Sequence, residues 1–193
     1  MTEIGPEQRR RFEELAMPHL DAAFNLARWL TGNNHDAEDV VQDAFLRAIR
    51  YFEGFRGDRF RPWLLQIVRH TAYTWMRENR PAEHVTLDED DERCFEVQTS
   101  LVDEPLAIAL RNADRTQINE AIAQLPAVFR EVLILRELED MSYRDIARVA
   151  GTPIGTVMSR LTRARRMLQN TLAPSSRPAL RTVATVVPRA VNS

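Results

Sequence analysis

Hydrophobic residues recur at three- and four-residue spacing along most of the chain, a pattern typical of helices that bury one face. In the first eighty residues the pattern fills three stretches, Phe12–Leu30, Asp36–Phe52 and Trp63–Arg80. Turn-forming residues separate the stretches, and Pro18 predicts a kink within the first. Asp36 is expected to cap the second helix at its N-terminus. We therefore predict a domain of three helices over residues 1–80.

The helical pattern is lost over residues 81–110, which are strongly acidic. This segment carries nine acidic residues and one arginine, and Pro81 and Pro105 lie near its ends. Such a composition is typical of a solvated linker. We predict that residues 81–110 join two domains flexibly.

Helical periodicity returns from Leu106 and continues to Leu168. Within it, Leu125-Pro126 predicts the end of one helix and the start of the next, because proline favours the first helical turn. We predict a second helical domain over residues 111–173, so the fold class is all-α with two small domains. Residues 174–193 are rich in Pro, Ser, Val and Arg without a period, and are predicted to be disordered.

Two short helices joined by a glycine form the most specific local pattern in the second domain. Ser142 and Asp145 have the form of a capping box and predict the start of the first of these helices. Gly151 suits the left-handed position that ends it. Thr152 is expected to cap the next helix, with Pro153 in its first turn. This arrangement predicts a helix-turn-helix.

The charge distribution indicates that this helix-turn-helix binds DNA. The net charge is only −2, but residues 141–193 carry nine arginines and one acidic residue, and all 26 basic residues are arginine. Arginine binds phosphate and can make paired hydrogen bonds to guanine. With the apolar side of the second helix buried, the side chains predicted to face a major groove are Thr156, Ser159, Arg160 and Arg163. The side chains predicted to contact phosphates are Arg144, Arg148, Arg165 and Arg166.

Several functional classes are disfavoured by what the chain contains. Cys94 is the single cysteine, so an internal disulfide or a CxxC pair is excluded. No apolar run approaches the roughly 18 residues of a membrane span, and the charged start is unlike a signal peptide, so we predict a cytoplasmic protein. The four histidines lack metal-ligand spacing and no glycine-rich phosphate loop is present. We therefore predict no enzyme activity, cofactor or metal site.

Three segments together resemble the extracytoplasmic-function (ECF) sigma factors of bacterial RNA polymerase. Residues 125–166 read LPAVFREVLILRELEDMSYRDIARVAGTPIGTVMSRLTRARR and resemble the domain with which that family reads the promoter −35 element. Residues 36–50 read DAEDVVQDAFLRAIR and resemble the helix that grips core polymerase. Residues 54–77 read GFRGDRFRPWLLQIVRHTAYTWMR and resemble the part that recognises the −10 element. The three segments follow the family's order and spacing.

The resemblance implies roles for residues of both domains. The side chains implied to bind core polymerase are Asp39, Gln42, Asp43, Leu46 and Arg47. Those implied to receive the unpaired −10 strand are Phe55, Arg56, Arg69, His70, Tyr73 and Arg77. Those implied to read the −35 element are Arg144, Arg148, Thr156, Ser159, Arg160, Arg163 and Arg166. The implied partners are core RNA polymerase, promoter DNA and an anti-sigma factor that can be membrane-bound, and the implied regulon responds to stress or to the envelope.

Two departures from the family pattern put the preferred promoter sequence in doubt. His70 stands where many members carry asparagine, and Met158 stands where lysine or arginine is common. One alternative function is a helix-turn-helix regulator that acts without core polymerase, although residues 1–80 resemble neither a dimer interface nor an effector domain. Another is a decoy that mimics a sigma domain, against which the intact basic helix argues.

Overall fold

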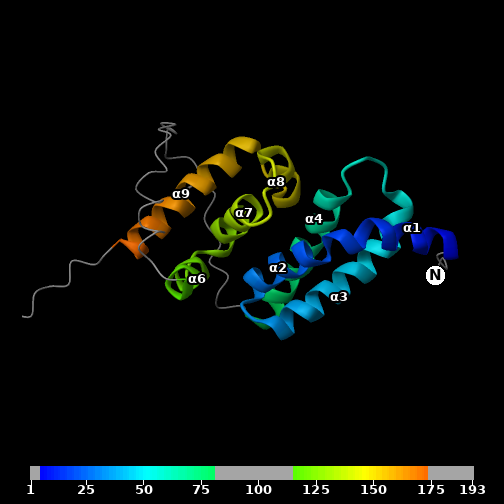
Figure 1. Ribbon diagram of the computed structural model, residues 1–193, viewed down its shortest axis with the longest axis horizontal. Coiled ribbons are helices and arrows are strands. Elements are labelled where there is room, and N and C mark those ends of the chain that lie inside the picture. The colour runs from blue at the N-terminus through cyan, green and yellow to red at the C-terminus, as the bar shows by residue number, and fades with distance from the viewer. Residues whose placement is uncertain (1–4, 81–114, 174–193) are drawn as a thin grey trace, which may run out of the picture.

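The computed structural model describes residues 5–80 and 115–173, which are helical and contain no strand within those ranges (Figure 1). The first range holds α1 (Pro6–Ala16), η1 (Met17–His19), α2 (Leu20–Thr31), α3 (Asn34–Tyr51), η2 (Phe52–Gly54) and α4 (Phe60–Asn79). The second range holds α6 (Arg115–Ala123), α7 (Ala127–Glu137), α8 (Tyr143–Ala150) and α9 (Ile154–Leu172). The all-α prediction is confirmed. The predicted linker 81–110, Cys94 and the predicted tail 174–193 lie outside the described residues.

The first predicted helix, Phe12–Leu30, is divided into three elements. Pro18 lies in the short 3-10 helix η1, between α1 and α2. Proline lacks the backbone N–H that a continuous helix would need at this position, so the kink predicted from the sequence takes the form of a 3-10 turn.

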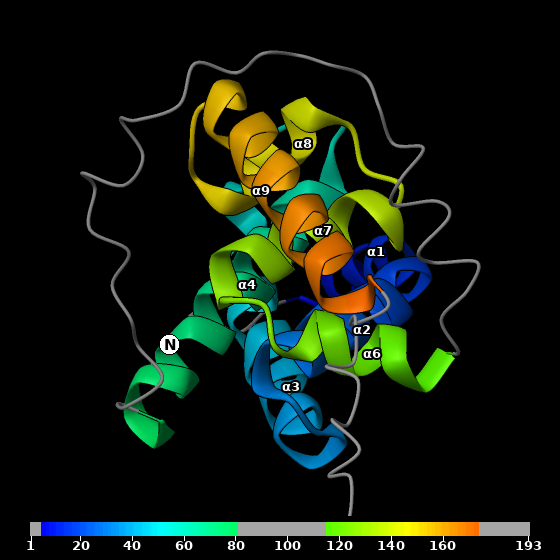
Figure 2. The same ribbon diagram turned by 90° about the vertical axis from the view of Figure 1, so that its left-hand side faces the viewer.

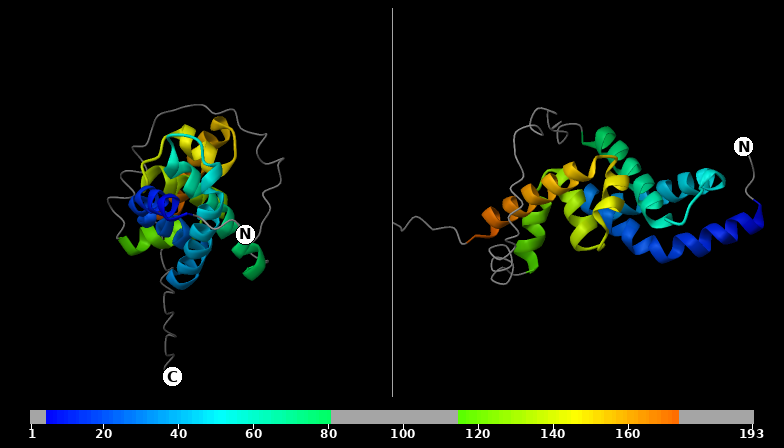
Figure 3. Two further views of the ribbon diagram at one scale, coloured as in Figure 1. Left: turned by 90° about the vertical axis from the view of Figure 1, so that its right-hand side faces the viewer. Right: turned by 90° about the horizontal axis from the view of Figure 1, so that it is seen from above.

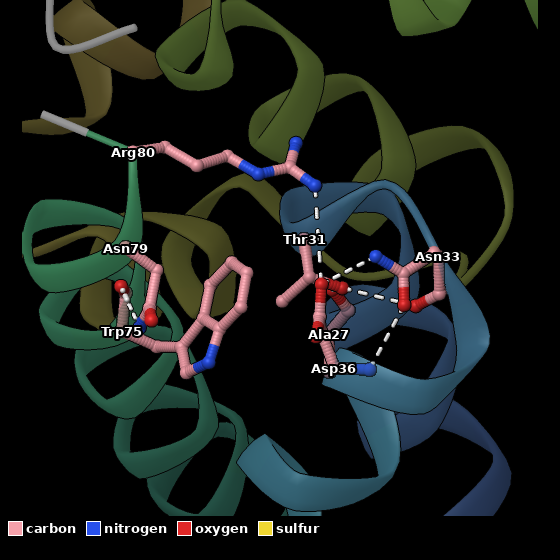
Figure 4. Close-up of polar contacts among 7 residues, drawn as sticks. All are labelled: Ala27, Thr31, Asn33, Asp36, Trp75, Asn79 and Arg80. Carbon is pink, nitrogen blue, oxygen red and sulfur yellow. Dashed lines mark hydrogen bonds and ion pairs between the residues drawn. The ribbon is translucent and has the colours of Figure 1, made fainter. Parts of the chain in front are cut away.

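The turn between α2 and α3 corrects the predicted cap (Figure 4). Gly32 has φ +85° and ends α2, and Asn33, not Asp36, is the N-cap of α3. The side-chain oxygen of Asn33 accepts a hydrogen bond from the backbone N–H of Asp36 at 2.9 Å. Asp36 instead lies in the first turn, where a carboxylate suits the helix dipole. Arg80 approaches that carboxylate to 3.8 Å and so holds the end of α4 against the turn.

The helix-turn-helix is formed by α8 and α9 with one difference in capping. The hydroxyl of Ser142 accepts the backbone N–H of Asp145 at 3.2 Å, and Gly151 has φ +66°, as predicted. The prediction that Thr152 caps α9 is wrong. Pro153 occupies the N-cap position without a side-chain hydrogen bond, and the buried Thr152 hydroxyl has no hydrogen-bond partner among the described residues.

Substitution by alanine at two glycines near this turn should change the free energy of unfolding in opposite directions. Gly151→Ala places a side chain at φ +66° and should lower the free energy of unfolding by about 1–2 kcal/mol. Gly155→Ala should instead raise it by less than about 1 kcal/mol, because Gly155 is exposed in the first turn of α9, where alanine is still the better helix former but the difference is smaller than in the helix interior. Urea titrations of the two variants measure both effects, and changes of the same sign would contradict the assigned backbone conformations.

The two groups of helices share buried apolar residues. One buried cluster runs continuously from Leu65 and Val68 of α4 to Val132, Ile146 and Val157 of the second group. Figures 1 and 3 show α2 and α4 lying against α7 and α8, and in Figure 2 α9 lies in front of α7. The two domains therefore pack as one body. Among the described helices, none has the length and apolar character needed to cross a membrane.

A second apolar contact extends the interface to α2. The indole of Trp29 is 9% exposed and belongs to a cluster whose other buried members all come from the second domain, such as Ile122, Phe129 and Leu168. Arg130 donates to the backbone oxygen of Trp29 at 2.7 Å. Trp29 is thus buried by the other domain.

Candidate nucleic-acid interface

One face of α3 is suited to a protein partner. Residues Asp39, Gln42, Asp43, Leu46 and Arg47 lie three or four positions apart along this helix, so they share a face. The Leu46 side chain is 52% exposed, and Asp43 and Arg47 form an ion pair of 2.8 Å beside it. Gln42 and Leu46 also line an open groove of about 930 Å³ between α3 and α1. An exposed leucine among mixed charges fits a protein surface better than a polyanion. We call this set the α3 face.

The loop between η2 and α4 forms a pocket with aromatic and basic walls. The Phe55 ring packs against Trp63 and Phe60, with centroid separations of 4.9 and 5.4 Å, and Arg56 is exposed. The pocket has a volume of about 520 Å³ and is also lined by Arg148 of α8. Aromatic rings and arginines are the side chains on which unpaired bases stack. The predicted −10 residues Phe55 and Arg56 therefore lie at one pocket, which Arg148 of the second domain also lines.

The remaining predicted −10 residues divide into two sets along α4. His70 and Arg77 are exposed. Arg69 and Tyr73 face the second domain, where Arg69 binds both carboxylate oxygens of Glu131 through Nε at 2.8 Å and Nη2 at 3.2 Å. Glu131 is 1% exposed, and the Arg69 guanidinium lies 4.5 Å from the Tyr73 ring centre.

The electrostatics of this cluster favour the charged form of Arg69. Burial alone would lower the pKa of Arg69, but the Glu131 carboxylate outweighs it, so the pKa is raised. Burial, with Glu131 close by, raises the pKa of Tyr73 well above its ordinary value. Arg160 of α9 also interacts electrostatically with Tyr73. Arg160, predicted to read the −35 element, therefore lies close to Tyr73, predicted to read the −10 element.

The other predicted −35 residues lie on α8 and α9 with different exposure. Arg144, Arg148 and Arg166 are exposed, as phosphate contacts require. The predicted base-reading side chains, Thr156, Ser159, Arg160 and Arg163, are partly buried. The Ser159 hydroxyl donates to the backbone oxygen of Thr156 at 2.9 Å.

Two further ion pairs join the domains and were not predicted from the sequence. Arg59 Nη1 lies 2.7 Å from an oxygen of Asp145, and Arg61 Nη2 lies 2.6 Å from an oxygen of Glu139. The other oxygen of Glu139 accepts a hydrogen bond from Asn25 of α2 at 2.7 Å. Burial would raise the pKa of Asp145, but the Ser142 hydroxyl and Arg59 outweigh it, so the pKa is lowered. Sequence offers no signal for these pairs, because their partners are 78 and 86 residues apart.

Comparison with known proteins decides what these surfaces belong to. The chain matches the family models for Sigma-70 region 2 over residues 15–81 and for Sigma-70, region 4 over residues 115–168. It is 36% identical to the RNA polymerase sigma-H factor of Pseudomonas aeruginosa over 89% of this chain and 91% of that protein. It is 39% identical to the ECF RNA polymerase sigma-E factor of Haemophilus influenzae over 77% of this chain and 80% of that protein. The chain is an ECF RNA polymerase sigma factor.

Solved structures similar to this sigma factor include both of its domains. It superimposes with a TM-score of 0.64 and 28% identity on the sigma factor RpoE of Bartonella quintana, crystallised in complex with the anti-sigma factor NepR, over 84% of this chain and 97% of that chain. It superimposes with a TM-score of 0.60 and 27% identity on CnrH, solved in complex with the cytosolic domain of CnrY, over 85% of this chain and 88% of that chain.

As a sigma factor, the protein acts in transcription initiation with core RNA polymerase and promoter DNA, and it is not an enzyme. The matched regions place the α3 face, the pocket at Phe55 and the exposed residues His70 and Arg77 of α4 in region 2. They place α8 and α9 in region 4. Within the described residues, no group of His, Cys, Asp or Glu is arranged to hold a metal ion.

Proposed function

We propose that this sigma factor docks on core polymerase through the α3 face and reads the −35 element with α8 and α9. The observation that supports this division most directly is the contrast between the two surfaces. The α3 face presents a half-exposed leucine among charges of both signs, whereas α8 and α9 present the exposed arginines Arg144, Arg148 and Arg166. Apolar surface with mixed charge suits a protein partner, and concentrated arginine suits DNA.

The −35 element is read by base contacts from Arg160 and Arg163 and from Thr156 and Ser159, which precede them on α9, and is positioned by phosphate contacts from the exposed arginines. The −10 element is held by the pocket at Phe55 and Arg56 and by Arg69, His70, Tyr73 and Arg77 along α4. Stacking on an aromatic ring offsets the few kcal/mol that unstacking a base costs. The domain division at residues 1–80, 81–110 and 111–173 belongs to the same proposal.

The similar solved structures support a third partner. RpoE and CnrH were each solved with a regulatory protein, and the match to each extends over both domains of this chain. We propose that an anti-sigma factor of similar kind binds this protein, that the protein works in the cytoplasm, and that its regulon responds to stress or to the envelope.

Reconstituted transcription tests the proposed function. The purified chain is added to sigma-free core polymerase on a library of bacterial promoter fragments, and the transcript starts are sequenced. We expect new starts that share a −35 and −10 pair. Binding to DNA without binding to core polymerase, and without new starts, would support the alternative of a regulator that acts alone.

Arg163→Ala should weaken promoter reading without weakening core binding. Loss of an arginine contact to a base costs about 1–3 kcal/mol, which corresponds to roughly 5- to 150-fold in promoter-dependent transcription. The measurement compares transcript yield with the dissociation constant for core polymerase. Arg115→Ala is the matched control, because Arg115 is exposed on α6, away from the proposed reading face. Equal losses for the two variants would contradict the assignment of Arg163 to base reading.

A further inference from the structure

We propose that the free chain holds itself in a closed, promoter-incompetent state. Three acidic residues of region 4 form ion pairs with three arginines of the −10 surface, Arg59, Arg61 and Arg69. We call these residues, Glu131, Glu139 and Asp145, the acidic clasp. The inference rests on the proposed function, because it takes α4 and its preceding loop as the −10 surface.

The inference rests on which domain supplies each charge in the contacts between the domains. Three ion pairs between the described parts of the two domains each join an arginine of region 2 to an acid of region 4. They are Arg69 to Glu131, Arg61 to Glu139 and Arg59 to Asp145. The bidentate geometry of Arg69 on Glu131 is the geometry that arginine adopts on phosphate. Region 4 thus presents carboxylates where promoter DNA would present phosphates.

The position of the two reading elements excludes promoter binding in this state. The −10 and −35 elements are separated by about 25 base pairs, or roughly 85 Å of straight duplex at 3.4 Å per base pair. In the structure, Arg59 at the start of α4 and Asp145 of α8 are 2.7 Å apart. Arg148, a predicted −35 contact, also lines the pocket beside Phe55. The two domains must separate before both elements can be read.

The closed state leaves the polymerase-binding surface available. Leu46 on the α3 face is 52% exposed while Arg69 is 15% exposed, so the surface for core polymerase stays open while the part of the −10 surface around Arg69 and Tyr73 is covered. Closure therefore blocks DNA contacts selectively. The closed chain is expected to dock on core polymerase first and to open on it.

Trp29 provides a direct readout of opening, since region 4 buries its indole. In a Trp63→Phe/Trp75→Phe background, Trp29 is the remaining tryptophan. Iodide quenching of the Trp29 fluorescence is compared between that background and the same background carrying Glu131→Gln and Glu139→Gln. We expect the charge-neutral variant to show a red-shifted emission and at least a severalfold larger quenching constant, while far-UV circular dichroism stays unchanged. Glu120→Gln on α6 removes a charge from an exposed site outside the clasp and should leave quenching unchanged.

DNA binding gives the functional outcome, with the same clasp substitutions made in a chain that keeps all three tryptophans, because Trp63 lines the pocket at Phe55. If the open state is rare, the apparent affinity is reduced by its population, so opening should tighten binding of the free chain to a fluorescent single-stranded 12-nucleotide probe by about tenfold or more. Quenching and affinity that are unchanged in a folded clasp variant would overturn the proposal. Should the variant fail to fold, small-angle scattering of the wild-type chain still decides, because separated domains in solution would overturn it as well.

The proposed function can fail independently of the clasp. Transcription with excess core polymerase and wild-type chain reports the sigma activity alone, whatever the free chain's conformation. Active transcription by a free chain whose Trp29 is already accessible would reject the clasp and keep the function.

Discussion

Replacing Leu46 by glutamate is expected to abolish promoter-dependent transcription by weakening the binding of the protein to core polymerase. Leu46 is 52% exposed, is the one apolar residue of the five that define the α3 face, and lines the groove between α3 and α1. Truncating an apolar anchor of a protein interface costs roughly 2–4 kcal/mol, and a buried carboxylate without a partner adds a desolvation penalty. We expect a dissociation constant for core polymerase that is weaker by about 30- to 1000-fold or more.

The control for Leu46→Glu is a second exposed apolar residue of the same domain. Met17 is 58% exposed in η1, outside the α3 face. Met17→Glu introduces the same charge and should leave core binding within about twofold. Fluorescence anisotropy of labelled protein with core polymerase measures both constants, and thermal melts show that the fold is retained. A Leu46→Glu variant that bound core polymerase normally would place the docking surface elsewhere.

The sequence was sufficient to predict the helices, because each buries one face and so carries a periodic pattern. The helix-turn-helix was predicted from Ser142 and Gly151, whose local hydrogen bonding and backbone angle depend on near neighbours. The errors arose where two residues close in sequence could both occupy the N-cap position of a helix. Asn33 and Asp36 are both good capping residues, and the turn at Gly32 decides between them. Thr152 could cap α9, but Pro153 occupies the cap position instead.

The contact between the domains could not be predicted from local pattern. Apolar residues such as Ile146 and Val68 predict burial, but the sequence does not show which element buries them. In the structure they belong to one cluster that joins the two domains. Glu131 lies within the apolar stripe of α7, where a charge is costly unless it is paired. That position was the one available signal that a cation approaches from another element, although nothing in the sequence identifies Arg69 as its source.

Arg69 and Glu131 provide a pair of substitutions that should open the protein equally and change transcription in opposite directions. Either Arg69→Ala or Glu131→Gln breaks the buried bidentate pair, and both should expose Trp29 to quencher. Glu131→Gln keeps the arginine that we assign to the −10 strand. At limiting sigma concentration it should raise transcript yield, since a larger fraction of the chain is competent to bind DNA.

Arg69→Ala should instead lower transcription. A charge-assisted hydrogen bond to phosphate contributes about 1.5–3 kcal/mol, so its loss should reduce promoter-dependent yield by roughly 10- to 150-fold at saturating core polymerase. The double variant should follow Arg69→Ala, because opening gives no advantage once the strand contact is gone. If Arg69→Ala raised the yield as Glu131→Gln does, Arg69 would serve closure alone. The −10 strand would then have to be held by His70, Arg77 and the pocket at Phe55, which stay accessible when the interface opens.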